Sequence, residues 1–175
     1  MEVSEAADLI TAAVTEGGTW ADLGAGSGTF TRALASLLGA AGTVYAVDRS
    51  PSVRNLARRG DEAGAAVLPI MADFTAPLDL PELDGILMAN SLHFVAAGAQ
   101  GRVVTQLSSN LKGGGAFALV EYDQRRGQPW VPYPVPPARF AELAEGAGLA
   151  VPREMGRRRS RYGPKDIYAA VAMKR

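Results

Sequence analysis

The stretch of this sequence with the clearest potential for chemistry is the glycine-rich segment DLGAGSGTF, from Asp22 to Phe30. It follows a short apolar strand pattern and precedes a helical pattern of leucines. Glycines at alternate positions let the chain turn tightly and leave no Cβ between the backbone and a ligand. Such a turn directs backbone N–H groups and a helix N-terminus at a bound group. We therefore expect a ligand-binding loop, with a plain strand-to-helix turn as the alternative.

The spacing of the glycines separates two kinds of nucleotide-binding loop. A dinucleotide fingerprint, G-x-G-x-x-G, would need a glycine at position 29, which is Thr29. The observed pattern, acid-x-Gly-x-Gly-x-Gly, resembles the first motif of class I S-adenosylmethionine (SAM) dependent methyltransferases. The resemblance implies that the loop holds the methionine part of SAM. The residues that it assigns to the cofactor are Asp22, Gly24, Ala25, Gly26, Ser27 and Gly28.

A second acid, Asp48, ends the next strand pattern, 24 residues after Gly24. This offset is close to that at which an acid meets the ribose hydroxyls in nucleotide-binding α/β folds. Asp48 is therefore predicted to bind the ribose, and its neighbour Arg49 is included in the cofactor site. The alternative is that Asp48 is a helix N-cap, since Ser50 and Pro51 begin the next segment.

A third acid follows the third strand pattern. In the resembled family, an acid at this point accepts a hydrogen bond from the adenine amino group, and a neighbouring apolar side chain covers the ring. Asp73 and Phe74 fit those roles by position. A loop acid and a core phenylalanine are the alternative.

The segment ANSLHF follows the fourth strand pattern and resembles the family's fourth motif in its small-molecule form. It lacks the N-P-P-Y sequence of nucleic-acid amino methyltransferases, which disfavours base N-methylation through that motif. Asn90 is assigned to the cofactor site. His93 is the candidate general base, because histidine titrates near neutrality, although a structural histidine is the alternative. Glu121 and Tyr122, after the fifth strand pattern, are weaker candidates.

The elements that position these residues predict one α/β domain over residues 1–175: a doubly wound, Rossmann-like, mostly parallel seven-stranded sheet that ends in an antiparallel hairpin. The strands are expected at Thr19–Leu23, Thr43–Val47, Ala66–Met71, Asp84–Ala89, Ala116–Val120, Val151–Gly156 and Ile167–Lys174. Helices are expected over 3–16, 29–38, 51–59, 97–111 and 138–145. Pro69 suggests an edge position for the third strand.

The proline-rich segment QPWVPYPVPP, residues 128–137, is the irregular insertion in this pattern. Its five prolines preclude a regular helix or central strand. The segment carries Trp130 and Tyr133, so it is either a lid or wall of the substrate pocket or a surface loop whose aromatic side chains cover the core.

Composition excludes several classes of function. The absence of cysteine rules out disulfides, thiolate metal sites and cysteine nucleophiles, and the single histidine rules out a usual zinc site. No metal is therefore expected. Because no stretch approaches membrane-spanning length and no signal sequence is seen, we expect a cytoplasmic protein that does not contact membranes.

The leading hypothesis is a methyltransferase that uses SAM to methylate a small molecule. The alternatives are an RNA or protein methyltransferase, or a non-catalytic SAM-binding partner subunit. Contact with nucleic acid through the arginine run Arg157–Arg161 is possible but not favoured, since basic runs are usually solvated faces. A homodimer is possible, because little sequence precedes the glycine loop to cover the site.

Overall fold

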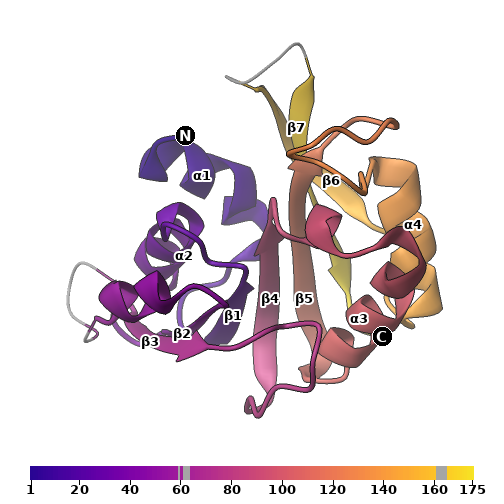
Figure 1. Ribbon diagram of the computed structural model, residues 1–175. Helices are drawn as coiled ribbons and strands as arrows, with labels where there is room; N and C mark the ends of the chain where they lie inside the picture. The colour runs from indigo at the N-terminus through magenta and orange to yellow at the C-terminus, as the bar shows by residue number, and fades with distance from the viewer. Residues whose placement is uncertain (59, 61–63, 161–164) are drawn as a thin grey trace.

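A computed structural model describes residues 1–58, 60, 64–160 and 165–175, and within these residues the chain forms one seven-stranded sheet (Figure 1). The strand order is β3-β2-β1-β4-β5-β7-β6. Strands β1 to β5 run parallel to one another, whereas β7 runs antiparallel to both β5 and β6. The predicted doubly wound sheet with its terminal hairpin is confirmed. The strands are β1 (Thr19–Leu23), β2 (Thr43–Asp48), β3 (Ala66–Met71), β4 (Leu83–Ala89), β5 (Leu111–Tyr122), β6 (Arg153–Arg159) and β7 (Asp166–Met173).

The helices lie on the two faces of this sheet. Helices α1 (Val3–Ile10) and α2 (Thr29–Leu38) pack on one face, and α3 (Ala97–Ser108) and α4 (Pro137–Gly146) pack on the other (Figure 1). Each helix buries an apolar stripe against the strands, as its sequence periodicity requires. Both faces of the central strands are therefore covered, which explains why their sequences are apolar throughout. Short 3₁₀ helices form η1 (Thr11–Ala13), η2 (Pro51–Leu56) and η3 (Leu92–Phe94).

The order of the strands fixes where a ligand can bind. The chain moves outward from β1 to β3 and then returns to place β4 on the other side of β1. The crevice at the carboxyl ends of β1 and β4 is therefore the topological switch point, where doubly wound sheets bind ligands. The glycine loop leaves β1 at this point, and the Asn90 segment leaves β4 beside it.

The predicted helix over residues 51–59 is wrong, because the chain forms only the 3₁₀ helix η2. Arg58 and Val67 exchange two backbone hydrogen bonds, with N···O distances of 3.1 and 2.8 Å. This bridge brings the chain alongside β3 and ends the helical turn. Arg59 lies outside the described residues. Pro69 lies on β3, the terminal strand of the sheet, as expected.

The strand bounds differ most around β5 and β6. Gly113–Gly115 lie within β5, although the strand is predicted only from Ala116, and the pairing of β5 with β4 changes register between Leu83 and Gly85. Arg157–Arg159, expected in the connection of the hairpin, belong to β6 and pair with β7. Backbone hydrogen bonds with Lys174 hold Gly114 and Gly115 in place, and the pairing with β7 holds Arg157–Arg159, neither of which the local composition predicts.

Candidate active site

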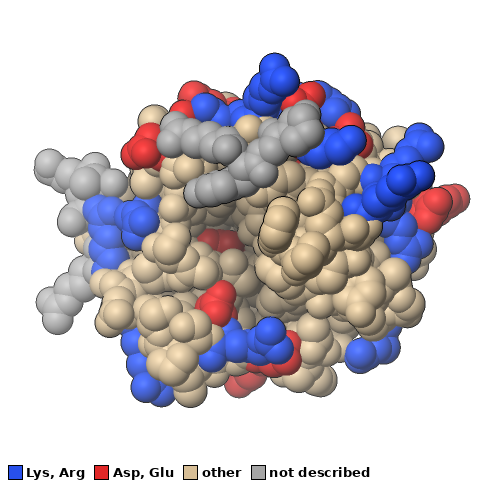
Figure 2. Space-filling view, turned by 45° about the horizontal axis from the view of Figure 1, so that its top comes forward, with Lys and Arg blue, Asp and Glu red and all other residues tan. Residues whose placement is uncertain are grey.

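A cavity of about 550 Å³ opens at the switch point, and acidic side chains lie inside it (Figure 2). It is lined by the ends of β1, β2, β3 and β4, together with parts of α2 and the terminal hairpin. Most residues that the sequence assigns to the cofactor meet here. They are Asp22, Gly24, Ala25, Gly26, Ser27, Asp48, Arg49, Asp73, Phe74 and Asn90.

Gly28 is the predicted cofactor residue that does not line this cavity. It is the N-cap of α2, with φ of 81°, and a Cβ added there would lie 2.4 Å from Cδ2 of Leu56. Its glycine is needed for the left-handed turn and for the close contact with η2. Gly28 thus packs against η2 and does not line the cavity.

The glycine loop is held by backbone hydrogen bonds that leave its inner side open. The amides of Gly24 and Ala25 both donate to the carbonyl of Val47, at 2.8 and 3.0 Å. A Cβ at Gly24 would lie 2.4 Å from Cβ of Ser91, so only glycine lets the loop approach the β4 end so closely. A Cβ at Gly26 would meet no atom nearer than 3.9 Å, since this residue faces open space. A side chain at Gly26 would therefore extend into the open space of the cavity.

Asp22 is a buried carboxylate on the cavity wall. Its side chain accepts a hydrogen bond from the Thr31 hydroxyl at 2.6 Å. Burial, against the opposing hydrogen bond from Thr31 and with a smaller contribution from the charge of Asp48, raises the pKa of the Asp22 carboxyl to about 6. An ionised carboxylate held in a buried site favours a cationic ligand beside it.

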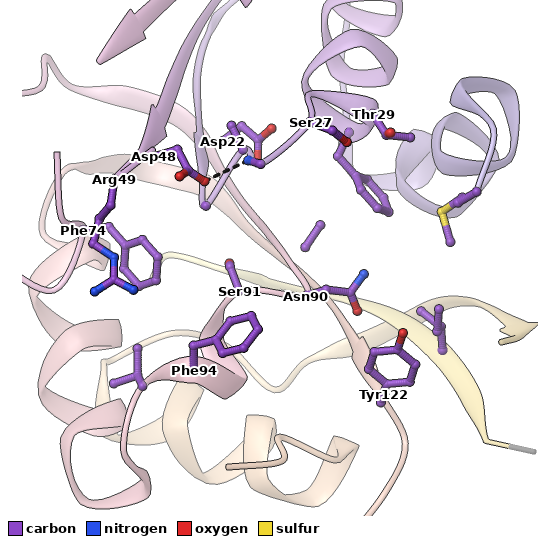
Figure 3. A pocket seen from close by; sticks show the side chains of 18 of the residues that line it. Asp22, Ser27, Thr29, Asp48, Arg49, Phe74, Asn90, Ser91, Phe94 and Tyr122 are labelled. Carbon is purple, nitrogen blue, oxygen red and sulfur yellow. Dashed lines mark hydrogen bonds between the residues drawn. The ribbon is translucent and has the colours of Figure 1, made fainter. Parts of the chain in front are cut away.

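The Asp48 side chain, at the end of β2, reaches the glycine loop, where its Oδ2 accepts a hydrogen bond from the Gly26 amide at 2.8 Å (Figure 3). Its Oδ1 accepts from the Ser50 amide at 2.8 Å. The cap of η2 is Ser50, whose hydroxyl accepts from the Ser52 amide, so the N-cap alternative for Asp48 does not hold. Each carboxylate oxygen retains a lone pair for a further donor.

Arg49 and Phe74 lie near one another at one side of the cavity (Figure 3), and Asp73 also lines the cavity. The hydroxyl and the amide of Thr75 both donate to Asp73, at 2.7 and 2.9 Å, and hold the pKa of its carboxyl below the ordinary value. Burial opposes that shift, and Arg49, 3.8 Å away, supports it. Asp73 and Phe74 thus both line the cavity, and the adenine roles stay a prediction.

His93 lies outside this cavity, on the wall of an adjoining one of about 530 Å³. Its Nδ1 lies 2.6 Å from Oε2 of Glu121, and its amide donates to Oε1 of the same carboxylate at 3.1 Å. Both side chains are buried. Because the carboxylate accepts the Nδ1 proton, a neutral imidazole carries its lone pair at Nε2. Glu121, predicted as a weak candidate base, thus hydrogen-bonds to both the ring and the backbone of His93.

The two cavities share three residues, Asn90, Phe94 and Tyr122. Asn90 is the non-glycine residue with positive φ, 53°, among the described residues. Strained backbone of this kind is often found at functional sites. The glycine loop lines the larger cavity and His93 lines the smaller one, and the three shared residues line both.

Sequence reasoning missed the contributions of Phe94, Met1, Arg158, Arg159 and Ile167 to the larger cavity. Phe94 ends the ANSLHF segment but has no predicted role. No local motif marks the other four, because they reach the site only through the packing of the N-terminal segment and the hairpin onto the sheet. Arg157 is held by Glu154 and Asp123, and Arg158 by Glu5. Two arginines of the run are therefore neutralised within the chain; Arg161 lies outside the described residues.

Within the described part of the chain, no cluster of His, Cys, Asp and Glu side chains has the arrangement of a metal site. Nor does that part contain a helix both long and apolar enough to cross a membrane.

The strand order, the acid-flanked glycine loop and the carboxylates at successive strand ends define a class I methyltransferase fold with a nucleotide-type ligand site. The chain belongs to the family described as methyltransferase domain, whose model matches residues 21–115. It is thus a SAM-dependent methyltransferase, as the sequence motifs predict, and SAM is its cofactor. A comparison with curated protein sequences finds no significant match.

Solved methyltransferase structures share this fold. The Burkholderia thailandensis 1,6-didemethyltoxoflavin-N1-methyltransferase, crystallised with 1,6-didemethyltoxoflavin and S-adenosylhomocysteine, has a TM-score of 0.78 and 20% identity, covering 98% of this chain and 77% of that chain. A Methanosarcina mazei SAM-dependent methyltransferase has a TM-score of 0.70 and 18% identity, covering 94% and 96%. Human N-acetylserotonin methyltransferase in complex with SAM has a TM-score of 0.71 and 20% identity, covering 97% of this chain but 51% of its own.

Proposed function

We propose that this enzyme transfers the methyl group of SAM to a small-molecule acceptor, with His93 as the general base. The observation that carries the proposal is the junction of two cavities at Asn90, Phe94 and Tyr122. One cavity has the acidic and glycine-rich lining that suits SAM. The other contains a buried histidine fixed by a carboxylate, which is an arrangement that suits proton removal.

The donor set of the larger cavity fits the parts of SAM. The glycine cradle accommodates the methionine portion, and the buried charge of Asp22 suits its cationic groups. Asp48 at the end of β2 is placed to accept from the ribose hydroxyls. Asp73 accepts from the adenine amino group, and Phe74 covers the ring.

Bound SAM supplies a methyl group on a positively charged sulfur, and transfer leaves the neutral thioether S-adenosylhomocysteine. The enzyme's own contribution is to align the acceptor and to remove its proton. His93 Nε2 takes the proton from the acceptor while the acceptor atom bonds to the methyl carbon. Glu121 holds the imidazole through Nδ1 and stabilises the positive charge that it gains.

The ribose assignment predicts that Asp48→Ala weakens binding of S-adenosylhomocysteine. Hydrogen bonds to a charged group contribute about 1.5 to 3 kcal/mol each, so the dissociation constant should rise at least about tenfold. Isothermal titration calorimetry measures this directly. Asp79→Ala is the matched control, because Asp79 is an exposed acid that lines neither cavity. Equal affinity of the Asp48 variant and the natural sequence would contradict the assignment.

Methyl transfer itself is tested with SAM carrying a tritiated methyl group and a panel of small hydroxyl, amine and thiol compounds, with bulk RNA and a protein lysate as separate arms. The proposal expects label in one or more small molecules. Label only in RNA or protein would reassign the acceptor class. Binding of S-adenosylhomocysteine without transfer to any arm would favour a non-catalytic partner subunit.

A further inference from the structure

The smaller cavity has walls that are mainly aromatic. It is lined by Asn90, His93, Phe94, Tyr122 and Trp130, and its volume of about 530 Å³ lies within the range of small-molecule sites. No lysine, arginine or carboxylate of the described residues lines it. A strongly charged group bound there would lack a partner, which favours a neutral ligand with a flat apolar body.

Two buried hydrogen-bond acceptors on this cavity have no partner among the described residues. They are Nε2 of His93 and Oδ1 of Asn90. Glu121 holds the Nδ1 side of the imidazole and does not line the cavity, whereas His93 does, with its Nε2 unpaired. Unpaired buried polar atoms are costly, and a ligand that brings a donor would satisfy them. A ligand with a hydroxyl or N–H group beside these two atoms would therefore suit the cavity.

Trp130 forms the outer wall and is 61% exposed, although tryptophan is usually well buried. The turn that carries it is closed by two hydrogen bonds between Gln128 and Val131, at 3.0 and 2.9 Å. The indole thus stands at the tip of a tight turn, where a flat ligand can cover it.

The loop behind this turn is fixed to the core. The Tyr133 amide donates to the carbonyl of His93 at 3.0 Å, and Gln100 donates to the carbonyl of Tyr133 at 3.0 Å. The hydroxyl of the buried Tyr168 donates to the carbonyl of Val135 at 2.7 Å. These hydrogen bonds attach the segment to the core, so that Trp130 and His93 line the same cavity without a movement of the loop.

We propose that the smaller cavity binds a planar aromatic compound that carries a hydroxyl group. Its ring stacks on Trp130 between Phe94 and Tyr122, and its hydroxyl donates to Nε2 of His93. The inference rests on the proposed function, because the bound compound is the methyl acceptor, but it concerns binding and is tested without turnover.

The test is calorimetric titration of the protein saturated with S-adenosylhomocysteine, using 7-hydroxycoumarin, 2-naphthol and catechol as probes. At least one should bind saturably, and for 7-hydroxycoumarin the parent coumarin, which lacks the hydroxyl, should bind about tenfold more weakly. Trp130→Ala should weaken binding of the hydroxylated probe about tenfold, and Trp130→Phe should restore part of it. Tyr133→Ala should bind normally, because Tyr133 is exposed on the same loop but lines neither cavity.

Equal binding of coumarin and 7-hydroxycoumarin, or equal losses in the Trp130 and Tyr133 variants, would overturn the proposal. So would the failure of all three probes to bind protein that does bind S-adenosylhomocysteine. In that last case the proposed methyl transfer to another small molecule would stand. Failure to bind S-adenosylhomocysteine would instead count against the cofactor assignments of the larger cavity.

Discussion

A His93→Gln variant will transfer methyl groups to a hydroxyl acceptor about 10² to 10⁴ times more slowly than the natural sequence. The amide cannot accept a proton as an imidazole does, although it can still hydrogen-bond to Glu121. Affinity for S-adenosylhomocysteine should be unchanged, because His93 does not line the larger cavity. Initial rates at saturating SAM, with calorimetry on the same preparation, separate the two effects.

The acidity of the acceptor makes this prediction sharper. A more acidic hydroxyl needs less help from a base, so the loss in His93→Gln should shrink along a series of increasingly acidic phenols. Glu121→Gln should show the same trend with a smaller loss, and Glu121→Asp should recover part of the rate. Ser108→Ala serves as control, since Ser108 Oγ is also buried without a partner but lines neither cavity. A loss that is uniform across the phenols would argue for a purely structural role of His93.

An Asp22→Asn variant will be more stable than the natural sequence at pH 7.5 and will bind SAM more weakly. Burial raises the pKa of Asp22 from 3.8 to about 6, so the folded protein binds this proton more tightly than the unfolded chain does. The stability gained from the proton is complete below pH 3.8 and is lost as pH rises through 6. At pH 7.5 the ionised group costs up to about 3 kcal/mol, which a neutral amide avoids while still accepting from Thr31.

Urea unfolding at pH 5 and pH 7.5 tests the stability part of this prediction. The difference between variant and natural sequence should be larger at pH 7.5, whereas Asp79→Asn, at an exposed site, should shift little at either pH. Calorimetry tests the binding part, where we expect about tenfold weaker binding of SAM, because the cationic methionine group loses its counter-charge. A variant that is less stable at pH 7.5 and binds SAM normally would contradict both the cause of the pKa shift and the role of Asp22.

Most residues assigned to the cofactor line one cavity, and their meeting there was predictable because they belong to short segments at the ends of successive strands. In a parallel sheet those ends meet at one edge, so a pattern such as acid-x-Gly-x-Gly predicts both the fold and the position of the site. Gly28 shows the limit of this reasoning. A glycine in a motif serves either a ligand or the packing of the loop, and only the contact with Leu56 reveals which.

The acceptor side was less predictable, since its parts come from distant segments. His93 and Glu121 are 28 residues apart, and their hydrogen bond depends on the pairing of β4 with β5. Trp130 reaches the cavity through a loop that is positioned by Gln100 and Tyr168. Arg157 and Arg158 resembled a free basic run, but acids from α1, β6 and the end of β5 neutralise them in the folded chain. Such pairings have no local sequence signal.

The most direct test of the account is calorimetric titration of the purified protein with S-adenosylhomocysteine, with NADH and NADPH as controls. The account predicts one site per chain, micromolar or tighter affinity for S-adenosylhomocysteine, and no binding of either nicotinamide. Binding of a nicotinamide without binding of S-adenosylhomocysteine would contradict the roles given to Asp22, Asp48 and Asp73, and with them the proposed reaction.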